Sequence, residues 1–182
     1  EIEWLITNEY RNNFIADLAS KIKGNVLVLY NFVEKHGIPL YSKIKQKNKK
    51  DVFQIHGKTD IEERELIRNI VNNHTNSVLV ASYGTCSTGI NIKNINAIIF
   101  ASPSKSVVRV LQSIGRGLRK SETKDNVVVY DISDDLHYKS YRNHTLRHMD
   151  ERLTIYNNEK FTYKTIKVKL GDIWTRIQKS SN

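Results

Sequence analysis

Short, mostly apolar runs recur along the chain at 25–30, 52–56, 77–82, 97–101 and 126–132. Each run has the length of a β-strand. Strands of a parallel sheet have this solidly apolar character because helices cover both of their faces. The runs therefore predict the strands of a parallel sheet.

Between these runs, the apolar residues have the spacing of amphipathic helices. A helix is expected over 8–23, where Gly24 ends it, and a further helical stretch, interrupted or begun at Pro39, is expected to end near Gln46. Thr59 and Glu62 have the spacing of a capping box for a helix that reaches about Asn73. Another helix is expected to open near Ser104. Strands that alternate with helices in this way predict the α/β class.

The pattern changes after Asp135. The segment 137–152 is polar with mixed charge and predicts a helix, whereas 161–170 alternates apolar with basic residues like a half-exposed strand. We therefore expect one α/β domain over 1–135 and a short basic extension over 136–182.

Composition narrows the classes of partner and compartment. The formal net charge is +10, which favours a polyanionic partner. Cys86 is the sole cysteine, so an internal disulfide or a multi-cysteine zinc site is excluded, and a reducing cytoplasm is expected. No apolar run is long enough for a membrane span. The chain begins with Glu1 and has no leader pattern, so we expect it to be part of a longer protein.

Several polar groups are candidates for chemistry, but each has a simpler interpretation. His137, His144 and His148 lack supporting ligands at metal spacing, so an exposed polar face is favoured over a metal site. The lysine run 43–50 is interpreted as a solvated helix end, with contact to a DNA backbone as the alternative. Asp131 and its neighbours Asp134 and Asp135 are assigned to helix capping and turns.

The strongest local motif is Gln-Ser-Ile-Gly-Arg-Gly-Leu-Arg at 112–119. Arg116 and Arg119 are three residues apart, so on a helix they point the same way, and Gly115 permits a close backbone approach. Two planar, permanently charged guanidinium groups suit the oxygens of a γ-phosphate. An exposed basic helix end explains the spacing about equally well.

A second motif, Ala-Ser-Tyr-Gly-Thr-Cys-Ser-Thr-Gly-Ile-Asn at 81–91, directly follows an apolar strand. Open α/β sheets bind their ligands at this end of a strand. Small hydroxyl residues and glycines can contact a phosphate backbone without reading bases. Taken alone, an ordinary Gly/Ser-rich surface loop is equally compatible.

In this order and spacing, the two motifs resemble motifs V and VI of the superfamily 2 helicases, which lie in the second RecA-like domain of those motors. Residues 88–91 are similar to the end of motif V, and Gln112, Gly115, Arg116 and Arg119 match the fixed positions of motif VI. The strand ending at 26–31 and the His-Gly near 53–57 resemble further family features. Tyr83 departs from the pattern, because one branch of the family has an acidic residue there.

The resemblance implies roles for individual residues. Arg116 and Arg119 would be catalytic and would reach the γ-phosphate of ATP, and Gln112 would help to set the same cleft. Gly89 and Asn91 would link the nucleotide site to the strand. Hydroxyl groups expected to contact DNA phosphates are those of Thr85, Ser87 and Thr88.

The chain lacks the phosphate loop and the acidic magnesium motif of such motors. The resemblance implies that a first RecA-like domain of the same longer protein supplies both and binds most of the Mg²⁺. The expected function is ATP-dependent DNA helicase or translocase activity, which this fragment alone would lack. Similarity at 30–32, 56–58 and 84–91 to recombination helicases implies remodelling of branched or single-stranded DNA. The alternatives are a non-catalytic module that binds or anneals nucleic acid and a motor that acts on RNA.

Overall fold

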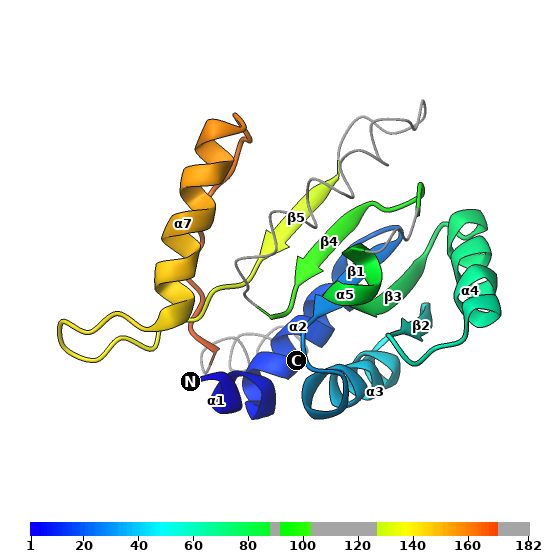
Figure 1. Ribbon diagram of the computed structural model, residues 1–182, viewed down its shortest axis with the longest axis horizontal. Helices are drawn as coiled ribbons and strands as arrows, with labels where there is room; N and C mark the ends of the chain where they lie inside the picture. Colours follow the sequence, from blue (N-terminus) through cyan, green and yellow to red (C-terminus); the bar gives the residue numbers. More distant parts are fainter. Residues whose placement is uncertain (88–91, 103–126, 171–182) are drawn as a thin grey trace, which may run out of the picture.

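The computed structural model describes residues 1–87, 92–102 and 127–170 (Figure 1). In this part of the chain, parallel strands form a single sheet in the order β2-β3-β1-β4-β5. The strands are β1 (Val26–Tyr30), β2 (Asp51–Ile55), β3 (Ser77–Ser82), β4 (Ala97–Phe100) and β5 (Val128–Asp131). The predicted α/β fold with a parallel sheet is confirmed, and each predicted strand lies within two residues of its expected bounds.

Helices surround this sheet. They are α1 (Ile2–Thr7), α2 (Glu9–Lys21), the π-helical turn η1 (Val33–Gly37), α3 (Ile38–Lys47), α4 (Ile61–Asn73), α5 (Tyr83–Ser87) and α7 (His144–Asn158). The helix expected near Ser104 lies outside the described residues. No helix in the described part of the chain is long and apolar enough to span a membrane.

Alternate side chains of the central strands pack on opposite faces of the sheet. In β1, Leu27 and Leu29 join the core beneath α4 and α5, whereas Val28 and Tyr30 join the core beneath α2 and α3. This two-sided packing explains why β1, β3 and β4 are buried along their whole length. The edge strands β2 and β5 are partly exposed, so the expectation of two covered faces holds only for the central strands.

The lysine run is more closely tied to the fold than expected. Lys43 and Lys47 form ion pairs with acidic residues of α2. Lys50 donates to backbone carbonyls at the end of α2, among them that of Ala19 at 3.3 Å. A cation placed there satisfies the last carbonyls of the helix and interacts favourably with its dipole.

The predicted capping box does not form. The hydroxyl of Thr59 accepts a hydrogen bond from the backbone N–H of His56 at 3.0 Å, and Asp60 precedes α4 without a side-chain cap. Thr59 is therefore used to close the turn after β2.

The part of the chain after Asp135 differs most from its prediction. The helix begins at His144 and not at 137, because 138–141 forms a turn closed by paired backbone hydrogen bonds between Tyr138 and Tyr141. The predicted strand at 161–170 joins no sheet in the described structure: 161–169 is exposed and extended. Successive side chains of an extended backbone alternate in direction, which places lysines on both of its faces, so neither face is apolar enough to cover a core.

Polar contacts with Glu1 and Asp131 join α7 to the rest of the fold. The Glu1 carboxylate accepts hydrogen bonds from the first backbone N–H groups of α7, those of His144 (2.9 Å) and Thr145 (2.8 Å). Arg152, in the middle of α7, forms a two-pronged pair with Asp131 at the end of β5, at 2.7 and 2.9 Å. These contacts hold α7 beside the carboxyl end of β5 (Figure 1). The division of the chain at 135/136 stays a prediction.

Candidate functional site

The carboxyl ends of all the parallel strands meet at one edge of the sheet. β3 ends there at Ser82 and leads directly into α5, and β1 and β4 end beside it at Tyr30 and Phe100. Ligands of open α/β sheets bind at this edge because the loops that follow the strands gather there. The predicted motif at 81–91 begins at this edge.

The start of that motif is an ordered helical turn and not the open loop that its composition indicated. The Ser82 hydroxyl lies 2.7 Å from the Thr85 hydroxyl and accepts from the Thr85 backbone N–H at 3.4 Å, which caps the turn. Gly84 is exposed, and an added Cβ would meet nothing within 4 Å. Gly84 therefore leaves the outer side of the turn open.

The predicted DNA-contacting residues are only partly visible in this region. Thr85 is buried, with its hydroxyl against Ser82. Ser87 is the last residue of α5, and Thr88 lies outside the described residues. Their contacts with phosphates stay predictions.

The residues expected to bind nucleotide also lie outside the described part of the chain. These residues are Gly89, Asn91, Gln112, Arg116 and Arg119. Their roles stay predictions that rest on the motifs. No group of three or more His, Cys, Asp or Glu side chains within 1–87, 92–102 and 127–170 could hold a metal ion.

Tyr83 and Cys86 fix α5 from below. The buried Tyr83 hydroxyl donates to the backbone carbonyl of Ser102 at 2.8 Å, and its ring lies against Phe100. Tyr83 thus joins the ends of β3 and β4, a structural task for the position that departs from the family pattern. Burial raises the pKa of the Cys86 thiol to about 12, so this cysteine is a core residue and not an activated nucleophile.

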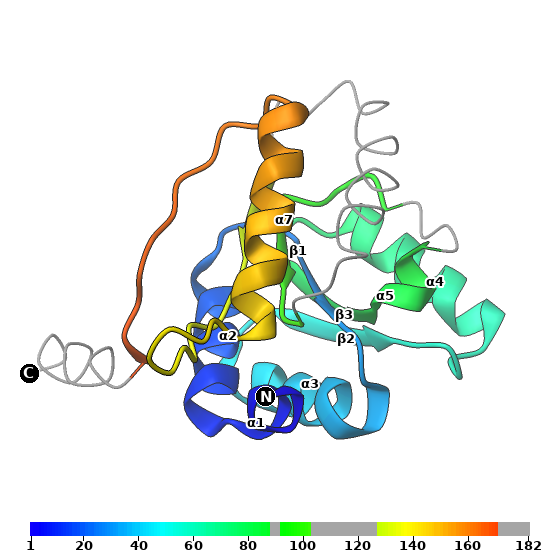
Figure 2. The ribbon, with the colours of Figure 1, turned by 60° about the vertical axis from the view of Figure 1, so that its left-hand side comes forward.

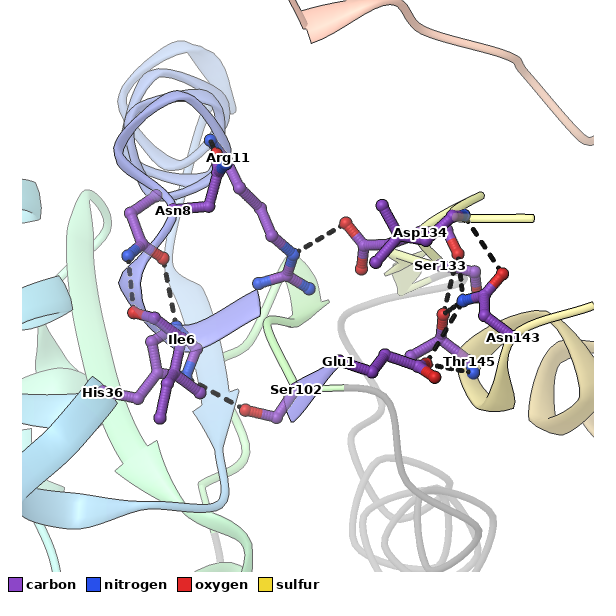
Figure 3. A network of polar contacts seen from close by, with 12 residues as sticks. Glu1, Ile6, Asn8, Arg11, His36, Ser102, Ser133, Asp134, Asn143 and Thr145 are labelled. Carbon is purple, nitrogen blue, oxygen red and sulfur yellow. Dashed lines mark hydrogen bonds and ion pairs between the residues drawn. The ribbon is translucent and has the colours of Figure 1, made fainter. Parts of the chain in front are cut away.

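A buried polar network lies between the ends of β1 and β4 (Figure 3). His36 is fully buried, with Nδ1 3.1 Å from the Ser102 hydroxyl and Nε2 3.1 Å from Asn12 Oδ1. The Asn12 amide group donates to the carbonyl of Ile6, so Oδ1 is the acceptor for His36 Nε2–H. Nδ1 then accepts from Ser102, whose oxygen accepts from the backbone N–H of Asn31. The network thus requires one neutral tautomer of His36.

The environment of His36 stabilises this neutral form. Burial, with a smaller contribution from the nearby Arg11 charge, lowers the pKa of His36 to about 4. Arg11 is itself 1% exposed and pairs through Nε with Asp134 at 2.8 Å. Asp131 and Asp134 therefore serve buried arginine pairs and not the predicted helix caps. Asp135 does form a turn, since it accepts from the His137 backbone N–H at 3.3 Å.

A cavity of about 290 Å³ adjoins this network. Residues of α1, the end of β1 and the start of α7 contribute to its walls; those nearest the network are Ile6, Arg11, Asn31, His36, Ser102 and Thr145. Sequence patterns did not single out His36, Arg11 or Ser102. A buried polar residue has no periodic signature, and only the pairing of the distant strands β1 and β4 brings these side chains together.

Comparisons with known proteins agree with this architecture. The model of the helicase conserved C-terminal domain matches residues 10–121. The ATP-dependent DNA helicase uvsW of Enterobacteria phage T4 is 34% identical over 176 residues, which cover 90% of this chain and 35% of uvsW. The chain thus spans about a third of the length of that relative. The crystal structure of T4 UvsW matches with a TM-score of 0.78 over 93% of this chain and 36% of that one.

Two more distant structures share the fold alone. The C-terminal domain of the DEAD-box protein Dbp5 matches at TM-score 0.62 and 14% identity, over 96% of this chain and 91% of that one. The C-terminal part of the Fun30 ATPase domain matches at a TM-score of 0.56 and 15% identity, over 87% of this chain and 58% of that one. The family model covers more than half of the chain, and the resemblance identified from the motifs is confirmed. The chain belongs to the helicase conserved C-terminal domain family and has the fold of the second RecA-like domain of superfamily 2 helicases.

Proposed function

We propose that this chain is the second motor domain of an ATP-dependent DNA helicase or translocase. The observation that carries the proposal is the 34% identity to T4 uvsW along 90% of the chain, because that relative is an ATP-dependent DNA helicase by name. The identity extends beyond the conserved family region at 10–121 into the extension. A shared fold alone would carry less, since one fold can serve many functions.

The more specific substrate is branched DNA. We infer fork regression, branch migration and R-loop unwinding, in recombination, repair and replication, from the local similarity at 30–32, 56–58 and 84–91. DNA in single-stranded or branched form and the first RecA-like domain of the same longer protein are the proposed partners. These assignments concern the whole protein, of which this chain supplies one domain.

The proposed cycle depends on a rigid sheet edge. ATP, with Mg²⁺ held mainly by the first domain, supplies the phosphoryl-transfer chemistry between the two domains. Arg116 and Arg119 would stabilise charge on the γ-phosphate, with Gln112 beside them. Gly89 and Asn91 would connect this site to the DNA-contacting hydroxyls of 85–88. The capped turn of α5, fixed by Tyr83, supports this role because closure of the cleft would then move the strand contacts together with β3.

The test uses a longer protein that contains both motor domains. Arg116→Ala or Arg119→Ala is expected to reduce kcat for ATP hydrolysis by about a thousandfold or more, as loss of an arginine finger does. Nucleotide binding should fall much less, and DNA affinity without nucleotide should stay within roughly threefold. Lysine at either position should restore little activity, because a point charge lacks the planar fork.

Two outcomes would favour the alternatives. Normal ATPase rates with tenfold weaker DNA binding would make these arginines strand contacts and favour a non-catalytic binding module. ATPase activity stimulated by RNA and not by DNA would favour a motor that acts on RNA.

A further inference from the structure

We propose that the segment 159–169, a turn followed by an extended run, is a second binding surface for single-stranded DNA, distinct from the motif at 81–91. The inference rests on the proposed function for the identity of the strand, and on the segment's own structure for its location. Every residue from 157 to 169 is exposed. Figure 2 shows the segment running back along α7 from its C-terminal end without joining the sheet.

The positive charge of the segment favours a polyanion as its ligand. Residues 159–169 contain four lysines and one acidic residue, Glu159. In the described structure, no hydrogen bond or ion pair engages the side chains of Lys160, Lys164 or Lys169, and Lys167 has only an electrostatic influence on Asp135. Cations without close partners are available to phosphates, and binding phosphates releases counterions from the strand.

Aromatic rings supply the second element of a single-strand site. Phe161 and Tyr163 are 50% and 44% exposed, and the centroid of each ring lies 6.2 Å from that of Tyr156. Tyr156 is buried, and its hydroxyl donates to Asp131 at the end of β5 at 2.9 Å. Two exposed rings are thus held in place from below, as a platform for stacked bases requires.

The same features disfavour a protein strand as the occupant. An extended segment with free backbone groups could pair with the edge of another sheet, but exposed lysines are a common means by which proteins prevent such pairing. Both faces of 160–169 carry lysines, so a sheet formed there would have no apolar face. A DNA strand needs no such face.

The position of the segment would also allow a strand bound at the motif at 81–91 to make a second contact. Asp131 is at the carboxyl end of β5, the sheet edge that also carries α5, and Tyr156 links the aromatic platform to it. A strand that leaves the motif at 81–91 along this edge would meet the side of α7. We infer that this segment increases the length of a single DNA strand that the motor domain contacts.

The test measures binding of a fluorescein-labelled (dT)20 strand to the 182-residue chain at several salt concentrations, without ATP. The triple variant Lys164→Gln, Lys167→Gln and Lys169→Gln should bind at least tenfold more weakly at low salt. Its slope of log affinity against log salt should be smaller by about 2, since each contact with a single strand contributes roughly 0.7. These side chains are exposed, so the fold should be unaffected.

The matched control removes the same charge elsewhere. Lys21, Lys23 and Lys93 are exposed and precede β1 and β4, at the opposite edge of the sheet. The triple variant with glutamine at these positions should bind within roughly threefold of the unmodified chain, with the same salt slope. Equal losses of affinity for (dT)20 in the two triple variants would show that only the net charge of the chain matters, and would overturn the proposal.

A second variant tests the stacking. Tyr163→Leu keeps an apolar contact with Tyr156, and it should weaken binding of (dT)20 about fivefold or more while leaving binding of an abasic strand unchanged. Unchanged affinity in both the lysine and the tyrosine variants would overturn the proposal and point to a protein partner for the segment. Because ATP is absent, the outcome is independent of whether Arg116 proves catalytic.

Discussion

His36 has two fixed hydrogen-bond partners in the interior, and this arrangement connects a single residue to the stability of the sheet edge. A protonated ring would donate from both nitrogens, but Ser102 would then lose its role as a donor to Nδ1. The charge would also be buried beside Arg11, which is a cation itself. The network therefore stabilises the fold only while His36 is neutral.

This coupling predicts a loss of stability in mild acid. The pKa of His36 is about 4 in the folded chain and near 6.5 when unfolded, so between these values only the unfolded chain binds the proton. The free energy of unfolding should therefore fall as pH falls from 6.5 towards 4, and His36 should contribute about 2 kcal/mol of that loss by pH 5.

Urea unfolding of the unmodified chain and of His36→Gln measures this contribution. The variant should be less stable at pH 7.5, because glutamine cannot reproduce both ring contacts. The difference in free energy of unfolding between the unmodified chain and the variant should be about 2 kcal/mol smaller at pH 5, because glutamine does not bind a proton in this range. A disadvantage that stays constant between the two pH values would show that His36 does not titrate as its burial predicts.

Two buried arginines could not be predicted from the local sequence. The local sequence marked neither Arg11 nor Arg152 as a core residue, yet both are 1% exposed. Each is buried against an aspartate: Asp131, the last residue of β5, for Arg152, and Asp134, 123 residues away in the sequence, for Arg11. No local pattern encodes such a pairing, whereas the apolar runs of the central strands encode their own burial directly.

At the scale of elements, α7 depends on polar contacts more than on a hydrophobic face. Arg152 donates to both Asp131 oxygens and to the Ser133 hydroxyl, and Tyr156 donates to the same carboxylate. The buried side chains of α7 are Thr145, Arg152 and Tyr156. Helix α7 is therefore attached mainly through the Asp131 carboxylate and the Glu1 cap.

Arg152→Ala should therefore weaken the fold strongly. Removal of the Arg152 side chain leaves the part-buried Asp131 carboxylate with the Tyr156 hydroxyl but without an opposite charge. Loss of one partner of such a buried pair costs about 3–5 kcal/mol. Arg142→Ala is the matched control, because Arg142 pairs with Asp150 at 2.7 Å on the surface and should cost about 1 kcal/mol or less. Urea unfolding measures both variants, and similar losses would contradict the assigned role of Arg152.

Element predictability followed the strength of the hydrophobic signal. The central strands lie close to their predicted bounds because their apolar runs encode their burial. Helix α4 lies close to the bounds predicted from a capping box, although the box itself does not form. The start of α7 was wrong because Glu1, at the other end of the chain, caps it. Helix α5 was missed because its glycine and hydroxyl residues are typical of loops, and the Ser82 cap with buried Tyr83 overrides that tendency.

At the scale of the whole molecule, the motifs predicted the family, whereas only the structure revealed the buried residues of the candidate site. The order and spacing of the motifs at 81–91 and 112–119 together indicated the relationship to helicases without any contact being known. The proposed roles of these motifs divide the site between two domains, because the arginines proposed for the γ-phosphate are present in this chain and a phosphate loop is not. The proposed chemistry therefore requires both motor domains.

The last prediction follows from this division. The 182-residue chain alone should show no DNA-stimulated ATP hydrolysis above background, although it should still bind DNA in a salt-dependent way. Without a phosphate loop, ATP lacks most of its ground-state binding, and without the acidic motif neither the metal nor the attacking water is positioned. Phosphate release should be measured with purified chain, with and without DNA, beside a longer protein that contains both domains. DNA-stimulated turnover by the short chain that disappears in Arg116→Ala would show that a complete catalytic site lies within these 182 residues.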